Sequence, residues 1–235
     1  MLNQIKGFLF FAVSFSSVIL IGFPLVIIGY LTNNQQLGFY GVTVFNRILF
    51  PILGIKITVT GKEHMDSNAA YLVLSNHQSF LDIIIILTHI RLIAFVAKME
   101  IKKWPVFGFA MKQMHCIFVD RSDPESRKLV GPAMEINIRK KISYCVYPEG
   151  TRSSKGRLLP FKPGIFKIAY SNNISILPVS ICDSWKILSK DSFKLSSGTI
   201  HCVIHKPVIP ADFDSFESLQ THIRGIIASP LEANA

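Results

Sequence analysis

The sequence predicts an α/β domain with a central, mostly parallel sheet flanked by helices, preceded by an N-terminal membrane-embedded helical hairpin. The first supporting observation is an apolar N-terminus with no formally charged side chain from Gly7 to Asn46. The second is a regular alternation of strand-like and helix-like runs from about residue 56, which is typical of parallel α/β sheets. We therefore divide the 235-residue chain into a membrane anchor of two apolar helices (1–55) and an α/β domain (56–235).

The N-terminal apolar run covers residues 7–31, and crossing a bilayer or lying deep in it takes about 20 apolar residues. A cleaved signal peptide is the alternative, but the run is longer than an ordinary signal core and no small-x-small site ends it. Residues 37–55 are also apolar, yet Arg47 lies in their middle, where a charge is costly in a spanning helix. We expect an interfacial second helix after a turn at 33–36, giving a hairpin in one leaflet, with a two-span hairpin as the alternative.

The remaining chain alternates between the two kinds of element. Apolar, β-branched runs predict strands at 55–61, 69–76, 91–98, 116–120, 142–148 and 174–181. Amphipathic or buried helical patterns are found at 79–90, 100–114 (one helix, or two around Pro105), 123–141, 166–172 and 215–229. Asp123 as cap and Pro124 at the first position are a usual helix start. Residues 193–208 resemble a hairpin.

The net charge of +10 is concentrated in residues 98–167, which contain 15 Lys or Arg and 6 Asp or Glu. Such a patch suits an anionic membrane surface or a phosphorylated substrate. No recognition-helix or zinc-finger pattern supports nucleic acid, which we do not expect as a partner. The four cysteines form no CxxC pair, so we expect buried thiols in a reducing compartment, with no disulfide and no zinc site.

The stretch SNHQSFLD (75–82) places His77 five residues before Asp82. On a regular helix these side chains would point about 140° apart, so they meet only if His77 precedes the helix, with Ser79 as its cap. Asp82 would then fix the tautomer of His77, whose other nitrogen takes a proton from a hydroxyl. No GxSxG motif supplies a serine nucleophile, so that hydroxyl would belong to a substrate. The alternative is a capping histidine beside a satisfied buried aspartate.

The stretch YPEGTRSSKGR (147–157) predicts a tight polar turn that could hold a phosphate. Glu149, Gly150, Thr151 and Arg152 make up the turn, and guanidinium groups bind phosphate in a bidentate manner. The surrounding basic residues are Arg152, Lys155, Arg157 and Lys162. We expect Glu149 to hold an arginine in place, and Arg121 at another strand end to add a cation. A solvated basic loop is the alternative.

These stretches together resemble the glycerolipid acyltransferase family, in particular its lysophosphatidic acid acyltransferases. Four blocks occur in the family's order: NHQSFLD (76–82), GFAMKQMHCIFVDR (108–121), YPEGTRS (147–153) and ILPVSI (176–181). The third block has Tyr147 where the family usually has Phe. The resemblance covers about residues 56–210.

The resemblance implies transfer of an acyl chain from a thioester, acyl-CoA or acyl carrier protein, to the 2-hydroxyl of 1-acyl-glycerol-3-phosphate, giving phosphatidic acid. It implies His77 as general base with Asp82 as its catalytic partner, and no metal, cofactor or covalent acyl-enzyme. The residues implied for the acceptor-phosphate site are Arg121, Glu149, Gly150, Thr151, Arg152 and, as a weaker candidate, Lys98. Membrane lipids are expected partners, at a cytoplasmic membrane with the active site on its cytoplasmic face. Backbone N–H groups near the start of the helix after His77 are one candidate for the oxyanion donors.

Three other functions stay open from the sequence. A related acceptor, such as glycerol 3-phosphate, a lysophospholipid or an amino-lipid, would use the same motif blocks. A catalytically silent module could bind anionic lipid through the basic patch, although the intact His77 and Asp82 argue against it. A thioester hydrolase would replace the acceptor by water, and the phosphate site would then have no evident role.

Overall fold

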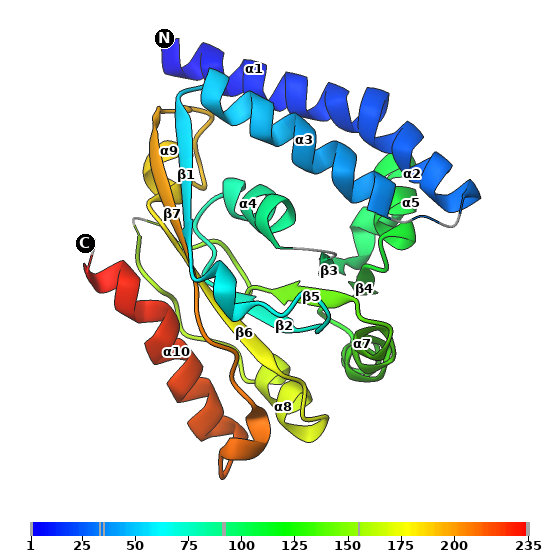
Figure 1. Ribbon diagram of the computed structural model, residues 1–235, viewed down its shortest axis with the longest axis vertical. Helices are drawn as coiled ribbons and strands as arrows, with labels where there is room; N and C mark the ends of the chain where they lie inside the picture. Colours follow the sequence, from blue (N-terminus) through cyan, green and yellow to red (C-terminus); the bar gives the residue numbers. More distant parts are fainter. Residues whose placement is uncertain (1, 33, 35, 91–92, 155, 234–235) are drawn as a thin grey trace.

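The computed structural model describes residues 2–32, 34, 36–90, 93–154 and 156–233. Its centre is a seven-stranded sheet in the order β1-β7-β6-β2-β5-β3-β4 (Figure 1). The strands are β1 (Ile55–Thr60), β2 (Leu72–Ser75), β3 (Ile93–Lys98), β4 (Ile117–Val119), β5 (Ser143–Val146), β6 (Ile176–Cys182) and β7 (Gly198–Ile204). The predicted start of β3 at 91–92 lies outside the described residues.

The sheet is mostly parallel, as the sequence predicts. Strands β2, β3, β4, β5 and β6 run in one direction, while β7 is antiparallel to β6 and parallel to β1. The predicted hairpin at 193–208 is wrong, because this segment contributes the single strand β7. Its partners are β6 on one side and β1 on the other, with Gly198 opposite Ile55. The pairing of β7 with β1 joins residues far apart in sequence, and local pattern does not specify such a pairing.

Helices cover both faces of the sheet (Figure 1). The helices of the α/β part are η2 (Lys62–His64), α4 (Leu81–His89), η3 (Met99–Lys103), α5 (Pro105–Gln113), α6 (Pro124–Lys128), α7 (Val130–Arg139), α8 (Gly164–Ser171), α9 (Ser184–Ile187), η4 (Pro210–Asp212) and α10 (Phe216–Ala233). Val73 joins a core with α4, whereas its neighbours Leu72 and Leu74 join a second core with α7, α8 and α10. This alternation is the period of two expected of a strand buried on both faces.

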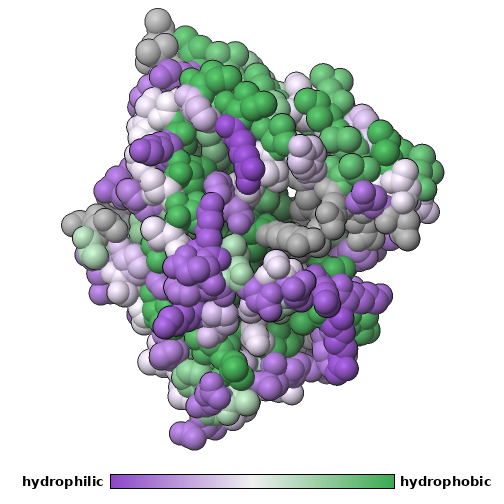
Figure 2. Space-filling view, in the orientation of Figure 1, coloured by the Kyte–Doolittle hydropathy of each residue, from purple (hydrophilic) through white to green (hydrophobic). Residues whose placement is uncertain are grey.

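Two apolar helical segments form the N-terminal hairpin. They are α1 (Leu2–Ser17), η1 (Val18–Gly22) and α2 (Phe23–Leu31), continuous with one another, and α3 (Gln36–Ile52). Within the described residues, Asn3–Leu31 is the one helix long and apolar enough to cross a membrane, judged by length and composition. The π-helical turn η1 lies just before Pro24, whose missing N–H interrupts the α-helical hydrogen-bond ladder. Apolar residues gather over these helices at one end of the molecule (Figure 2).

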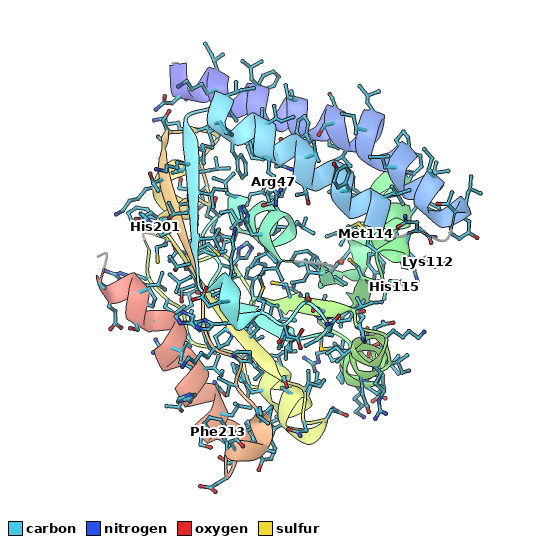
Figure 3. All side chains as sticks on the ribbon, viewed as in Figure 1. Arg47, Lys112, Met114, His115, His201 and Phe213 are labelled. Atoms are coloured by element: carbon cyan, nitrogen blue, oxygen red, sulfur yellow. The ribbon has the colours of Figure 1, made fainter. Side chains whose placement is uncertain are left out.

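Arg47 lies against the α/β domain (Figure 3). Its Nη2 donates to the Thr88 carbonyl at 3.4 Å, at the carboxyl end of α4. A cation at this end of a helix is favoured by the helix dipole. Arg47, in the middle of α3, therefore has a hydrogen-bond partner in the protein, which is consistent with α3 packing against the α/β domain. Of the predicted turn at 33–36, residues 33 and 35 lie outside the described residues.

Candidate active site

The predicted site residues follow the carboxyl ends of parallel strands. Strand β2 leads into Asn76 and His77, β5 into the 147–153 turn, and β4 into Arg121. The fully buried Asn76 extends β2 by its side chain, because its Nδ2 and Oδ1 each form a 2.8 Å hydrogen bond with the backbone of Ile181 on β6. This amide fixes the direction in which the chain leaves the sheet toward His77.

His77 and Asp82 meet, as the sequence predicts for a histidine that precedes the helix. Nδ1 of His77 lies 2.9 Å from Oδ2 of the fully buried Asp82. The same oxygen accepts from the backbone N–H groups of Gln78 at 2.6 Å and Ser79 at 2.7 Å. In return, the Ser79 hydroxyl accepts from Leu81 N at 3.2 Å. The N-cap of α4 is Phe80, so Ser79 is not the cap that the sequence predicts. The helix start and the orientation of the imidazole nevertheless depend on one carboxylate, that of Asp82.

Most of the backbone N–H groups from His77 to Asp82 already have acceptors. His77 N donates to Glu149 Oε1 at 2.7 Å, and the N–H groups of Gln78 and Ser79 donate to Asp82. Further along the chain, Leu81 N and Asp82 N both bind Ser79, whereas Phe80 N, just before them, has no such bond within the described residues. Of the candidate oxyanion donors named from the sequence, the N–H groups other than that of Phe80 therefore hold the loop, and the prediction stays open for Phe80 N.

Glu149 binds backbone N–H groups instead of the arginine that the sequence analysis predicts. Its carboxylate is buried and accepts from His77 N at 2.7 Å and from Leu159 N at 2.8 Å. Among the described residues, no ion pair joins it to an arginine, so that expectation is wrong. Burial raises the pKa of Glu149 to about 7, although the two backbone hydrogen bonds act in the opposite direction. Ser153 N and the Ser153 hydroxyl both donate to the His77 carbonyl, at 2.7 and 3.3 Å. With the bond from His77 N to Glu149, three hydrogen bonds therefore join the two motif loops.

Cationic side chains converge on Gly150. Arg121 Nη1 donates to the Gly150 carbonyl at 3.1 Å, across the gap between β4 and the 147–153 turn. Gly150 has φ +73°, and a Cβ there would lie 2.8 Å from Nζ of Lys162. Lys162 therefore lies directly over the turn, while Arg152, two residues further on, is half-buried. A turn with positive φ beside guanidinium and ammonium groups suits an anionic ligand.

The other predicted residues of the phosphate site are less constrained. Lys98 ends β3 and pairs with Glu100 at 2.8 Å, with both side chains more than half exposed. Thr151 is exposed at the tip of the turn. Lys155 lies outside the described residues. The structure thus brings Arg121 and Lys162, one of the basic residues named from the sequence, together at Gly150.

Tyr147 is a site contact that the sequence analysis missed. Its ring stacks on the His77 imidazole with centroids 4.0 Å apart and planes 15° apart. The sequence shows a tyrosine at this motif position, but the contact requires β2 and β5 to be neighbours, which no local pattern specifies.

A histidine oriented by a buried carboxylate, beside a cationic turn, is an arrangement suited to an enzyme that activates a hydroxyl group next to an anion. The sequence profile of the family described as Acyltransferase matches residues 56–182. The chain belongs to the acyltransferase family.

Relatives support this assignment over most of the chain. A chloroplastic 1-acyl-sn-glycerol-3-phosphate acyltransferase of Brassica napus is 36% identical over 162 residues, covering 68% of this chain and 47% of its own length. A probable 1-acyl-sn-glycerol-3-phosphate acyltransferase of Mycoplasma genitalium is 34% identical, covering 75% of this chain and 71% of its own length. The chain thus spans about half the length of the plant protein.

A solved structure supports the fold. The crystal structure of the 1-acyl-sn-glycerophosphate acyltransferase PlsC from Thermotoga maritima matches with a TM-score of 0.86 at 24% identity, covering 98% of this chain and 96% of that one. The likeness extends over both the N-terminal helices and the α/β sheet.

Proposed function

We propose that this protein transfers an acyl chain from a thioester to the 2-hydroxyl of 1-acyl-glycerol-3-phosphate, giving phosphatidic acid for phospholipid synthesis. The observation that carries the proposal is the contact between His77 and Asp82, at the same sheet edge as the cationic turn at Gly150. The activities for which these relatives are named support the same acceptor.

In this reaction His77 is the general base. Asp82 holds Nδ1, which leaves Nε2 to take the proton from the acceptor hydroxyl. The hydroxyl oxygen attacks the thioester carbonyl carbon, and the tetrahedral intermediate then breaks its C–S bond. The proton held by His77 passes to the leaving thiolate, which restores the neutral imidazole. No serine nucleophile or metal is needed for this sequence of steps.

The acceptor phosphate binds at the turn beside this dyad. Arg121, Arg152 and Thr151 are proposed as its direct donors, with Gly150 allowing close approach and Lys98 as an outer cation. Glu149 acts on the other side of the turn, where it holds the backbone of His77. Placing a phosphate monoester here fixes the hydroxyl relative to the base, and such orientation accounts for a large share of catalysis in bimolecular transfers.

The N-terminal hairpin, residues 1–55, serves as membrane anchor for a catalytic part formed by 56–235. Both substrates carry long acyl chains, and each buried methylene stabilises membrane association by about 0.8 kcal/mol. The exposed apolar surface of the Asn3–Leu31 helix supports membrane lipids as partners. We propose the cytoplasmic membrane face as location, because acyl-CoA and acyl carrier protein, the two candidate donors, are cytoplasmic thioesters.

Acyl transfer from a labelled thioester tests the proposal, with protein-containing membranes and either 1-acyl-glycerol-3-phosphate or glycerol 3-phosphate as acceptor. We expect labelled phosphatidic acid with the lyso acceptor alone, and its loss in His77→Ala, which should remain membrane-bound. Label in the product of glycerol 3-phosphate, or of another lysolipid, would replace the acceptor in the proposal. Release of free fatty acid without any acceptor dependence would identify a thioester hydrolase instead.

A further inference from the structure

The stacked contact between His77 and Tyr147 joins two neighbouring strands at their ends. Strands β2 and β5 are paired in parallel, with Leu74 opposite Val146, and both chains leave the sheet at the same edge. The rings lie 4.0 Å apart and are inclined by only 15°, so one face of the imidazole is covered by the phenol ring. The His77 side chain is 13% exposed.

Two constraints therefore act on the imidazole in different directions. Asp82 bonds Nδ1 in the plane of the ring, which fixes the tautomer but still permits the ring to tilt about that bond. Tyr147 packs against the ring face, which opposes this tilt. The face of an aromatic ring also attracts positive charge, so the contact strengthens when the imidazole gains a proton.

The phenol hydroxyl is buried, and we assign it no part in proton transfer. It lies in the interior beside Cys145. Burial is the main cause that raises the pKa of Tyr147 well above its usual value, and the nearby Cys145 and Asp82 raise this pKa further. Tyr147 thus stays neutral, and its contribution to the site comes from the ring.

We propose that Tyr147 is a positioning residue, whose ring face holds the His77 imidazole in the plane in which Nε2 reaches the acceptor hydroxyl. The inference rests on the proposed role of His77 as general base. Phenylalanine supplies the same ring face, whereas leucine supplies bulk without one. The stack therefore contributes to the rate of the chemical step and leaves the binding of both substrates unchanged.

The test compares Tyr147→Phe and Tyr147→Leu in the acyl-transfer assay, with kcat and both KM values measured. We expect Tyr147→Phe to retain the wild-type kcat within about twofold. Tyr147→Leu should lower kcat about tenfold, which corresponds to about 1.4 kcal/mol, with both KM values unchanged. Tyr71→Leu is the matched control, since it removes a buried tyrosine ring at the opposite end of β2, where Tyr71 OH accepts from Asp66 N.

The inference is overturned if Tyr147→Leu keeps the wild-type kcat, if Tyr147→Phe loses as much kcat as Tyr147→Leu, or if Tyr71→Leu reproduces the loss of kcat at an equal drop in Tm.

A second readout is independent of activity: the ring-proton resonances of His77, assigned by their absence in His77→Asn. We expect them to move downfield in Tyr147→Leu, where the ring current is removed, and to stay in place in Tyr147→Phe. If the wild type is inactive but the resonances move in Tyr147→Leu, the proposed function is rejected and the ring contact stands. If the wild type is active but the resonances do not move, only the ring contact is rejected.

Discussion

At the residue scale, two buried carboxylates determine the geometry of the candidate site. Asp82 and Glu149 between them accept three consecutive backbone N–H groups, from His77, Gln78 and Ser79. Removing either acceptor would leave a buried donor without a partner, which costs about 1–3 kcal/mol. The loop before α4 is therefore rigid because two carboxylates, one from its own helix and one from the neighbouring motif, bind its backbone.

Glu149→Gln should destabilise this loop. An amide can accept one of the two N–H groups that Glu149 binds, but its NH₂ group then faces the other donor. We expect the unfolding free energy to fall by about 1–3 kcal/mol and kcat to fall more than the acceptor KM rises. Lys98→Met is the matched comparison, because it alters an exposed side chain at the same sheet edge and should change KM alone.

The same variant tests the pKa of Glu149. Burial raises this pKa from an ordinary value of 4.5 to about 7, so between these values the folded protein holds a proton that the unfolded chain has lost. The contribution of Glu149 to stability is therefore greatest below pH 4.5 and decreases as the pH rises to about 7. The stability difference between wild type and Glu149→Gln should narrow over this window, as measured by unfolding in detergent micelles. A difference that widens with pH would show that the carboxylate ionises more readily in the folded state.

Arg152→Ala should raise the KM for the lyso acceptor at least tenfold, because loss of a charge-assisted hydrogen bond to phosphate costs about 1.5–3 kcal/mol. The KM for the thioester should change by less than twofold. Arg139→Ala is the control, since Arg139 is exposed on α7 and pairs with Glu135 on the same helix. Equal effects of Arg152→Ala on the two KM values would remove this residue from the phosphate site.

The sequence predicts the contents of the site better than its contacts. The meeting of His77 and Asp82 follows from the chain itself, because a loop of five residues at a helix start constrains both side chains. The bonds from Glu149 to the His77 backbone and the ring contact of Tyr147 join segments more than 65 residues apart. Their geometry depends on which strands are neighbours, and the periodicity of each strand carries no information on that order.

At the element scale, a close approach of backbone to backbone attaches α1 to the domain. Leu195 N donates to the Asn3 carbonyl at 2.9 Å, and a Cβ added to Gly7 would lie 1.6 Å from the Phe193 carbonyl oxygen. Phe10, one turn further on, is fully buried in the same core as Leu81. The predicted hairpin is thus packed on the catalytic part through its first helix, a contact that hydropathy alone does not specify.

Gly7→Ala should therefore destabilise the protein, although alanine is the better helix former. The added methyl group forces α1 away from the 193–195 segment, and overpacking of this kind costs about 1–3 kcal/mol. Gly225→Ala in α10 is the matched control, because a Cβ there meets nothing within 4 Å and should stabilise by about 0.5–1 kcal/mol. Thermal unfolding of both variants in the same detergent measures the contrast. A rise in Tm for Gly7→Ala would mean that α1 does not pack closely on this segment.

At the scale of the whole molecule, polar and apolar surfaces are separated. The N-terminal helices carry most of the exposed large apolar side chains at one end, while polar residues dominate the other end of the view in Figure 2. Deleting residues 1–34 would remove the first helix of the proposed anchor, but it would also uncover the core around Phe50 and Leu81, because Phe10 would be lost from it. Single charges on the exposed face separate membrane binding from folding more cleanly than a deletion does.

The three most exposed large apolar side chains of the Asn3–Leu31 helix are Phe8, Leu20 and Leu31, each more than 70% exposed. A carboxylate at the centre of a membrane-embedded helix costs about 2.5–3.5 kcal/mol, so Leu20→Asp should weaken binding to vesicles, measured by flotation. Leu129→Asp is the control, since Leu129 is 69% exposed but belongs to the segment between α6 and α7. Leu20→Asp should keep its Tm and its turnover of detergent-solubilised substrates, and lose turnover of substrates held in vesicles. Detachment by Leu129→Asp, with Leu20→Asp still bound, would move the membrane-facing surface to α7.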